Sequence, residues 1–564
     1  GNAVFYDIVK VFNDVQLQTG GDLKFMQTVN ALQSLEVLNS NSTTFTGLVT
    51  AANSVVLTDT VDAHVIAFNG GLTTPTFTVA AEPFALTLRG TVSVSNGMDL
   101  ANTGALQLSG AFTTNNQAIT LGQPAQTATL LGNTTFDSGT ATTTVKGNLS
   151  GSANTLGFAS PVNFSGTSSV TASTTTFSKG VTAAGDLTLN GATVVNGTGV
   201  DSGSRKQTYN GSVTVGRLAS ETTTFTGVGM TFGSTLDGTS RVVVADSGAT
   251  TYTGAIGSVA APAHFETDAA GSSKFSGGLV RTSSPNSINI ADDAVVTVDT
   301  TFDTTNNGAL AAGANITFGK TLNSDSAGAH AVTLNAGTNG SVSVVGAIGN
   351  AHPVSTLTLT NSNGAVFNAP VTTSTSVVLT DTVAGQTISF ADNLSTPVLT
   401  TTAHGYHLEL LGTTTNVSAT NTATTFLNTG NLVLGNGAGD TLTFAGGLTA
   451  TAPAAISAAG TLNTTNTALS LGDANTALTL AANLTLDTTG ANASAGGSLT
   501  LGGLVNGTTA NTESLILNAG STGAVSVVGS MGQTTSLKTL TLTNSNGAVF
   551  NAPVTTSTSV VLTD

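Results

Sequence analysis

Four aspartates that lie close together in the sequence are the best candidates for holding a cation. Asp292, Asp293, Asp299 and Asp303 form the densest group of carboxylates in the chain. Ca²⁺ takes six to eight oxygen ligands, so these residues could contribute to a calcium site on a loop or between subunits. Solvated carboxylates that bind no metal are the simpler interpretation, and we favour it.

A second calcium candidate is the glycine-rich stretch from Gly435 to Asp440, which reads GNGAGD. It resembles one copy of the calcium-binding nonapeptide of toxin-type repeats. That motif requires Gly where Ala438 stands, and it requires tandem copies to build a site. Neither condition is met, so a glycine-rich corner is the favoured interpretation and Asp440 remains only a weak candidate.

The histidines and the remaining carboxylates do not form a catalytic pattern. His404 and His407 are the closest pair, but residues three apart on a strand face opposite sides, which is poor geometry for a shared metal. Asp59, Asp381 and Asp564 each close a VVLTD string, where an aspartate that bonds its own backbone at a corner is expected. We therefore predict no enzymatic activity.

Composition narrows the class of protein. Charged residues are 7% of the 564, against a typical ~25%, while Val and Thr abound and there is no cysteine. Abundant β-branched residues favour strands over helices or disorder. The net charge of −16 makes nucleic acid an unlikely partner, and no stretch is long and apolar enough for a membrane-spanning helix.

Internal repeats organise the chain. The 26 residues from Thr356 to Asp381 return unchanged from Thr539 to Asp564, at an offset of 183. Related copies lie near residues 21–90, 248–280, 331–412 and 514–564, and the copy near the start is offset by 322. Such units bury their apolar face only by stacking on neighbours. Because the chain ends inside a copy, we expect it to be a segment of a longer array.

The repeat pattern predicts an all-β fold, a parallel and right-handed β-helix of roughly 20 or more coils. Phe45 and Phe68 are 23 residues apart, as are Phe367 and Phe390, and a coil of ~20–27 residues with three short strands has this size. An array of β-sandwich domains is the alternative. Residues 1–30 are expected to be a strand-rich start or a cap, and residues 31–564 a continuous solenoid. The predicted interior residues are Phe45, Phe68, Phe275, Leu357, Leu359, Phe367, Phe390, Phe444 and Phe550.

Strings such as QTYNGSVTVG (207–216) and LNAGTNGSVSVVGAIG (334–349) resemble the β-strand repeats of very large bacterial surface proteins. These are the adhesin-like, filamentous-haemagglutinin-like and autotransporter-like proteins. The resemblance implies an exported, extracellular or cell-surface solenoid that serves adhesion, matrix or surface coating. It brings no catalytic residues and no cofactor.

The expected function is therefore structural: a cell-surface fibre, sheath or surface layer built by self-association, end to end or laterally. The alternative is the stalk of an adhesin whose binding tip lies outside this chain, with host or matrix carbohydrate as its ligand. More distant alternatives are a β-helix enzyme acting on carbohydrate, for which basic residues are too few, and an ice-binding protein, because TLTLT strings present threonine rows.

Overall fold

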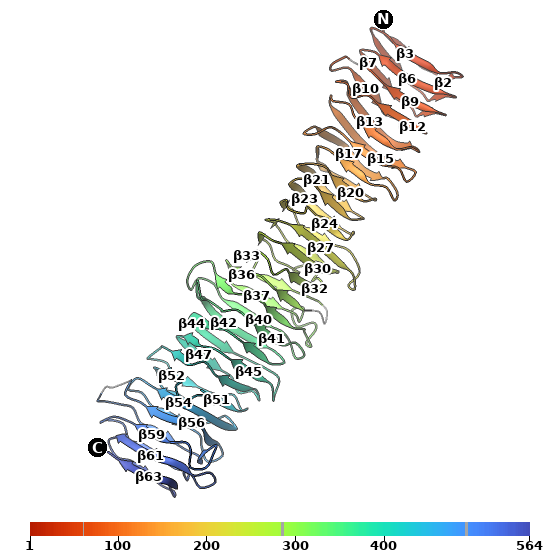
Figure 1. Cartoon of the computed structure of the whole chain (residues 1–564). Helices are drawn as coiled ribbons and strands as arrows, with labels where there is room; N and C mark the ends of the chain where they lie inside the picture. The colour runs from red at the N-terminus through yellow and green to blue at the C-terminus, as the bar shows by residue number, and fades with distance from the viewer. Residues whose placement is uncertain (60, 284–286, 491–493, 564) are drawn as a thin grey trace. The chain divides into compact units, whose positions relative to one another are not determined.

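The structure is a computed structural model, and it describes residues 1–59, 61–283, 287–490 and 494–563. The chain is all-β, without a helix, and forms a parallel β-solenoid of about 25 turns (Figure 1). The fold class predicted from the repeats is therefore confirmed, and the array of β-sandwich domains is not found. The described residues accordingly contain no helix that could cross a membrane.

Contacts divide the chain into two compact units, which are described separately. The first comprises Gly1–Ala263 with Ala270–Ser272, and the second comprises His264–Ala269 with Ser273–Asp564. Each is a stack of coils held by parallel ladders between one coil and the next.

The first unit begins with coils of three short strands. Strands β1 (Ala3–Phe5), β2 (Val9–Val11) and β3 (Val15–Gln18) pair in parallel with β4 (Asp22–Phe25), β5 (Val29–Ala31) and β6 (Ser34–Asn39). Alternation decides which side chains turn inward: in β4, Leu23 and Phe25 are buried while Asp22 and Lys24 are exposed. Residues 1–30 are thus built from the same kind of strands as the coils that follow.

Farther along this unit each coil combines one long strand with one short strand. The long strands bend around a corner, and the ladder shifts register at the bend, as between Leu108 and Gly110. The long strands are β13 (Ala85–Val94), β15 (Leu106–Thr114), β17 (Thr127–Asp137), β19 (Asn148–Phe158), β21 (Ser168–Phe177) and β23 (Leu187–Val195). The short strands are β12 (Thr76–Val79), β14 (Met98–Leu100), β16 (Ile119–Leu121), β18 (Thr143–Val145), β20 (Val162–Phe164), β22 (Val181–Ala183) and β24 (Gly199–Asp201).

Aromatic rings stack along the interior of the first unit. Phe5, Phe25, Phe45 and Phe68 form a continuous column with ring centroids 4.7, 4.9 and 4.8 Å apart. The column exists because Phe25 faces Phe45 and Phe45 faces Phe68 in the ladders of β7 (Ser42–Phe45) with β4 and with β10 (Val65–Phe68). Identical rings one coil apart bury their faces against each other, which gives stacking energy beyond the burial of area.

In the second unit the repeated block forms the same coil twice. Residues from Thr356 onward give β42 (Val354–Asn361), β43 (Ala365–Phe367) and β44 (Val371–Leu379), and residues from Thr539 onward give β61 (Leu537–Asn544), β62 (Ala548–Phe550) and β63 (Thr556–Leu562). The corner before β43 needs a left-handed glycine, with φ of 95° at Gly364 and 94° at Gly547. Pro370 lies between β43 and β44, outside both ladders.

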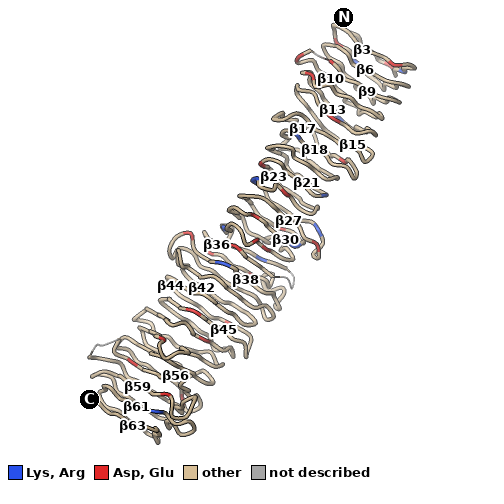
Figure 2. The backbone as a smooth tube through the Cα atoms, viewed as in Figure 1, with Lys and Arg blue, Asp and Glu red and all other residues tan. Residues whose placement is uncertain are grey.

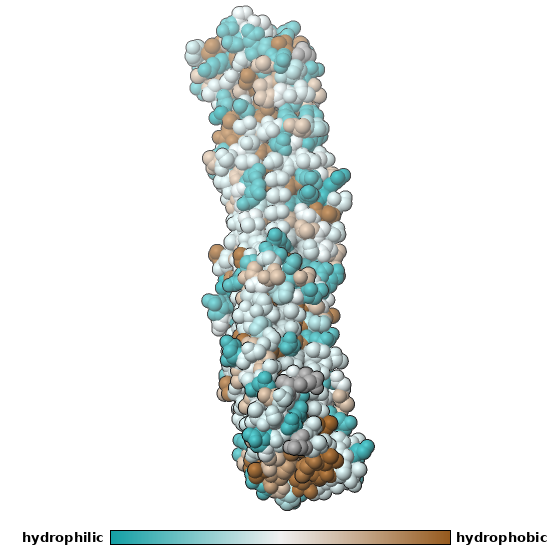
Figure 3. Space-filling view, turned by 90° about the vertical axis from the view of Figure 1, so that its left-hand side faces the viewer, coloured by the Kyte–Doolittle hydropathy of each residue, from teal (hydrophilic) through white to brown (hydrophobic). Residues whose placement is uncertain are grey.

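The predicted interior residues lie inside, with one difference. Phe550 lies on β62, the last strand of its sheet, and is only half-buried because no further strand covers it. The same uncovered coil exposes Val549, Val560 and Leu562 by 57, 48 and 66%, and Figure 3 shows the apolar surface at this end. The others are 2% exposed or less: Phe45, Phe68, Phe275, Leu357, Leu359, Phe367, Phe390 and Phe444.

Candidate functional site

The four clustered aspartates are each engaged by hydrogen bonds. Asp292 lies inside the second unit, 3% exposed, and accepts hydrogen bonds from the Thr267 hydroxyl at 2.7 Å and the Ser273 hydroxyl at 2.8 Å. Next to it, Asp293 accepts from the backbone N–H and the hydroxyl of Thr321 on the following coil. The two neighbours therefore serve different contacts, as alternation along β36 (Asp293–Val296) requires.

The other two aspartates of the group stabilise corners. Asp299 is exposed and accepts the backbone N–H of Ala331 at 2.9 Å. Asp303 is buried and accepts the backbone N–H groups of Thr305 at 2.8 Å and Asn307 at 2.6 Å, which fixes a turn. Throughout the part of the chain that the structure describes, no three His, Cys, Asp or Glu side chains lie close enough together to hold a metal ion. Calcium binding here stays a prediction.

Asp440 closes its own glycine-rich turn. One carboxylate oxygen accepts the backbone N–H groups of Asn436 and Gly437, both at 2.8 Å, and the side chain is 5% exposed. A carboxylate satisfied by two backbone donors within its own loop needs no cation.

The recurring aspartates and the histidines also take separate roles. Asp59 accepts the N–H of Val61 at 3.1 Å, the local bond expected at a corner. Asp381 instead lies 3.3 Å from Nδ1 of His404, while Nδ1 of His407 accepts the N–H of Asn431 at 2.7 Å. His404 and His407 therefore have different partners, and Asp564 lies outside the described residues.

Asp292 gives a testable dependence of stability on pH. Burial raises the pKa of its carboxyl, against the opposing effect of the hydrogen bonds from Thr267 and Ser273. The folded chain therefore holds this proton more tightly than the unfolded chain, whose Asp has a pKa of about 3.9. Stability from this group is present below that pH and is lost as pH rises through the raised folded pKa. We expect Asp292→Asn to remove this loss and to be more stable than the parent chain at pH 7, as measured by urea unfolding between pH 3.5 and 7.

Asp299→Asn is the matched control, because Asp299 is exposed and Asn keeps an acceptor for the Ala331 N–H. It should leave the slope of stability against pH as in the parent. Equal slopes for the parent and Asp292→Asn would contradict the assignment.

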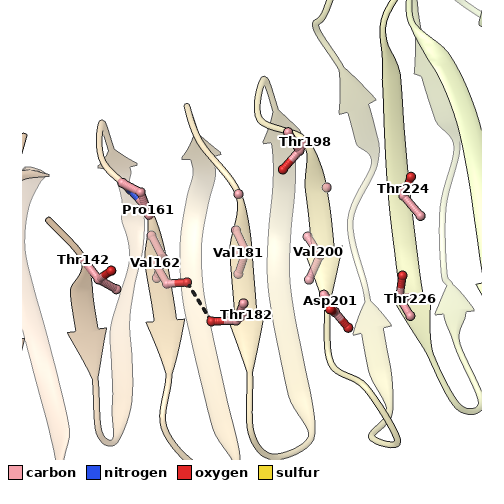
Figure 4. A pocket seen from close by; sticks show the side chains of 12 residues that line it. Thr142, Pro161, Val162, Val181, Thr182, Thr198, Val200, Asp201, Thr224 and Thr226 are labelled. Carbon is pink, nitrogen blue, oxygen red and sulfur yellow. Dashed lines mark hydrogen bonds between the residues drawn. The ribbon is translucent and has the colours of Figure 1, made fainter. Parts of the chain in front are cut away.

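The largest hollow among the described surfaces lies on the first unit, along the short strands. It has a volume of about 580 Å³ and extends across β18, β20, β22 and β24 to β27 (Thr222–Gly227), as Figure 4 shows. Its lining includes Thr142, Thr182, Asp201 and Thr226, and the Thr182 hydroxyl donates to the Val162 carbonyl at 3.4 Å. No sequence motif marks these residues.

Two further hollows adjoin this one and share residues with it. One, of about 430 Å³, contains Lys179, Arg217 and Glu221. The other, of about 440 Å³, contains Ser202 and Arg205. The first shares Gly180 and Thr198 with the central hollow, and the second shares Thr182 and Asp201, so the three form one surface.

A salt bridge shapes one wall of this surface. Arg217 Nη2 lies 2.7 Å from Glu221 Oε1, and the other Glu221 oxygen accepts the Leu218 N–H at 3.1 Å. The hydrogen bond from Leu218 and then that from Arg217 lower the pKa of Glu221, which keeps it ionised at neutral pH. The segment from 216 to 221 is thus folded into a compact ridge.

Comparison of the chain with protein families, with curated proteins and with solved structures found no match in any of the three.

Proposed function

We propose that this chain is a structural repeat protein that self-associates into an extracellular or cell-surface fibre, sheath or layer. The observation that carries the proposal is the coil formed twice by one sequence. In β42, Leu357 faces Val332 of β40 (Val332–Asn335), whereas in β61 the equivalent Leu540 faces Leu515 of β59 (Leu515–Asn518). One coil therefore stacks in the same register on different neighbours, as a scaffold of interchangeable parts requires.

The surface chemistry supports a mechanical role over a catalytic one. Thr, Ser and Asn side chains dominate the outward positions, and charged residues are sparse along the backbone (Figure 2). Catalysis by acid and base requires paired titratable groups that converge on one point. The carboxylates examined above are instead bound to backbone N–H groups or to hydroxyls of their own and neighbouring coils.

Other copies of the chain are the proposed partners. The proposal involves no nucleic acid, because a net charge of −16 opposes binding to phosphates. It requires no cofactor. Calcium at Asp292, Asp293, Asp299, Asp303 or Asp440 would be an addition, so the test below is run with and without it.

Electron microscopy and sedimentation test the assembly directly. The purified chain, imaged by negative stain over a rising concentration series, should give periodic filaments or lattices, and the sedimentation coefficient should rise with concentration. Parallel samples with EDTA and with added Ca²⁺ separate metal-dependent contacts from direct ones. Isolated monomers at every concentration would contradict self-association and would favour the stalk of an adhesin.

A further inference from the structure

The short strands of the first unit carry a row of outward polar side chains in continuous register. Each strand has buried residues on both sides of its outward residue, as Val181 and Ala183 flank Thr182 in β22. Every member pairs with the next one across the ladders. The row consists of Thr78, Asp99, Thr120, Thr144, Asn163, Thr182, Asp201 and Thr226.

This row becomes the floor of a trough where the connecting segments lengthen. Residues 178–180 and 196–198 join the long strands to the short strands β22 and β24, whereas the longer segment 216–221 leads into β27. On the other edge, the longer segment 202–206 follows β24, where residues 184–186 follow β22. The longer segments rise at both edges of the floor and give the three adjoining hollows their walls.

Basic side chains line both edges of this trough. Lys179 and Arg217 lie on one edge, and Arg205 lies on the other. For Lys179 and Arg205 no carboxylate partner is found among residues that the structure describes. Residues 138–236 hold five Lys and Arg against three Asp and Glu, a net of +2 in a chain of net −16. Figure 2 shows basic positions around β23 and β27.

We propose that this trough binds an extended anionic polysaccharide, one whose sugars carry carboxylates. The floor offers hydroxyl, amide and carboxylate groups one coil apart, which suit the hydroxyls of successive sugar units along a linear chain. Lys179, Arg205 and Arg217 at the edges meet the carboxylates of the glycan with charge-assisted hydrogen bonds. This binding activity goes beyond the proposed structural role and does not depend on it.

The same surface disfavours a peptide or a nucleic acid. The backbone of β20, β22 and β24 is paired on both sides with neighbouring coils, so no free strand edge is available for an added peptide strand. The floor presents no aromatic ring on which a base could stack. A polar floor with basic edges leaves a glycan as the ligand that fits.

Titration calorimetry of the full chain with size-defined oligogalacturonate tests the proposal, with the carboxyl-reduced oligosaccharide as the neutral counterpart. We expect saturable binding of the anionic form and weaker binding of the reduced form. Lys179→Gln with Arg205→Gln should weaken binding roughly ten-fold, because two exposed charge contacts are lost. Thr182→Tyr should weaken it without any change of charge, because the ring fills the trough.

Lys24→Gln with Lys320→Gln is the matched control, since both lysines are exposed and neither lies at the trough. This pair should bind as the parent does. Equal weakening by both pairs would mean non-specific attraction and would overturn the site. So would the absence of binding, or equal binding of the reduced oligosaccharide. Self-association is measured separately, so failure of either proposal leaves the other standing.

Discussion

Replacement of Phe45 by alanine is expected to destabilise the coils around it by about 3–5 kcal/mol. The ring is fully buried between Phe25 and Phe68, with centroids 4.9 and 4.8 Å away. Truncation removes both stacking contacts and leaves a cavity that rigid ladders on either side cannot close. Because each coil contacts mainly its neighbours, the loss is local.

Hydrogen–deuterium exchange measures this effect coil by coil. Amides of β4, β7 and β10 should exchange about a thousand-fold faster in Phe45→Ala, which corresponds to ~4 kcal/mol. Lys24→Ala is the control, because Lys24 is exposed on the outer face next to Phe25. It should leave protection unchanged. If Phe45→Ala also left protection unchanged, the aromatic column would contribute nothing to the stack.

The second large effect concerns Gly191 at the bend of β23. Its φ is +98°, and a Cβ at this position would lie 1.9 Å from the Ala172 carbonyl oxygen of the preceding coil. Gly191→Ala combines an unfavourable left-handed backbone with a clash against backbone that cannot turn aside. We expect a loss of about 3 kcal/mol, visible as faster exchange in β21 and β23 and a lower midpoint of thermal unfolding.

Gly166→Ala provides the matched comparison. Gly166 has no left-handed φ, and a Cβ there would meet nothing within 4 Å. Alanine at such a site reduces the freedom of the unfolded chain and should stabilise by about 0.4–1 kcal/mol. Opposite signs for the two substitutions would support the account, and equal effects would refute it.

The repeating interior could be predicted from the sequence because it is written at a fixed spacing. Phe45 faces Phe68 and Phe367 faces Phe390 in the ladders, as their separation of 23 residues suggested. Inward residues must match from coil to coil, so their pattern survives changes in the loops. Phe550 differs because burial depends on a neighbouring strand as well as on the residue itself.

The surface features could not be predicted in the same way. Asp292 is buried under hydroxyls that lie 25 and 19 residues away, and sequence proximity to Asp293 suggested a shared role that the pleat of the strand forbids. The trough arises from the lengths of segments 202–206 and 216–221, which leave the interior pattern unchanged. A signal was present in the concentration of basic residues between 138 and 236, but only the fold shows that Lys179 and Arg205 lie at opposite edges of one floor.

The coil that forms twice has a consequence for how such a gene can change in length. Leu359 and Leu542 occupy the same place in β42 and β61, so the 183 residues between them advance the stack by whole coils. An in-frame duplication or deletion of that segment would join surfaces that already meet elsewhere in the protein. Recombination between the identical stretches of coding sequence would thus lengthen or shorten the solenoid without requiring any new core to evolve.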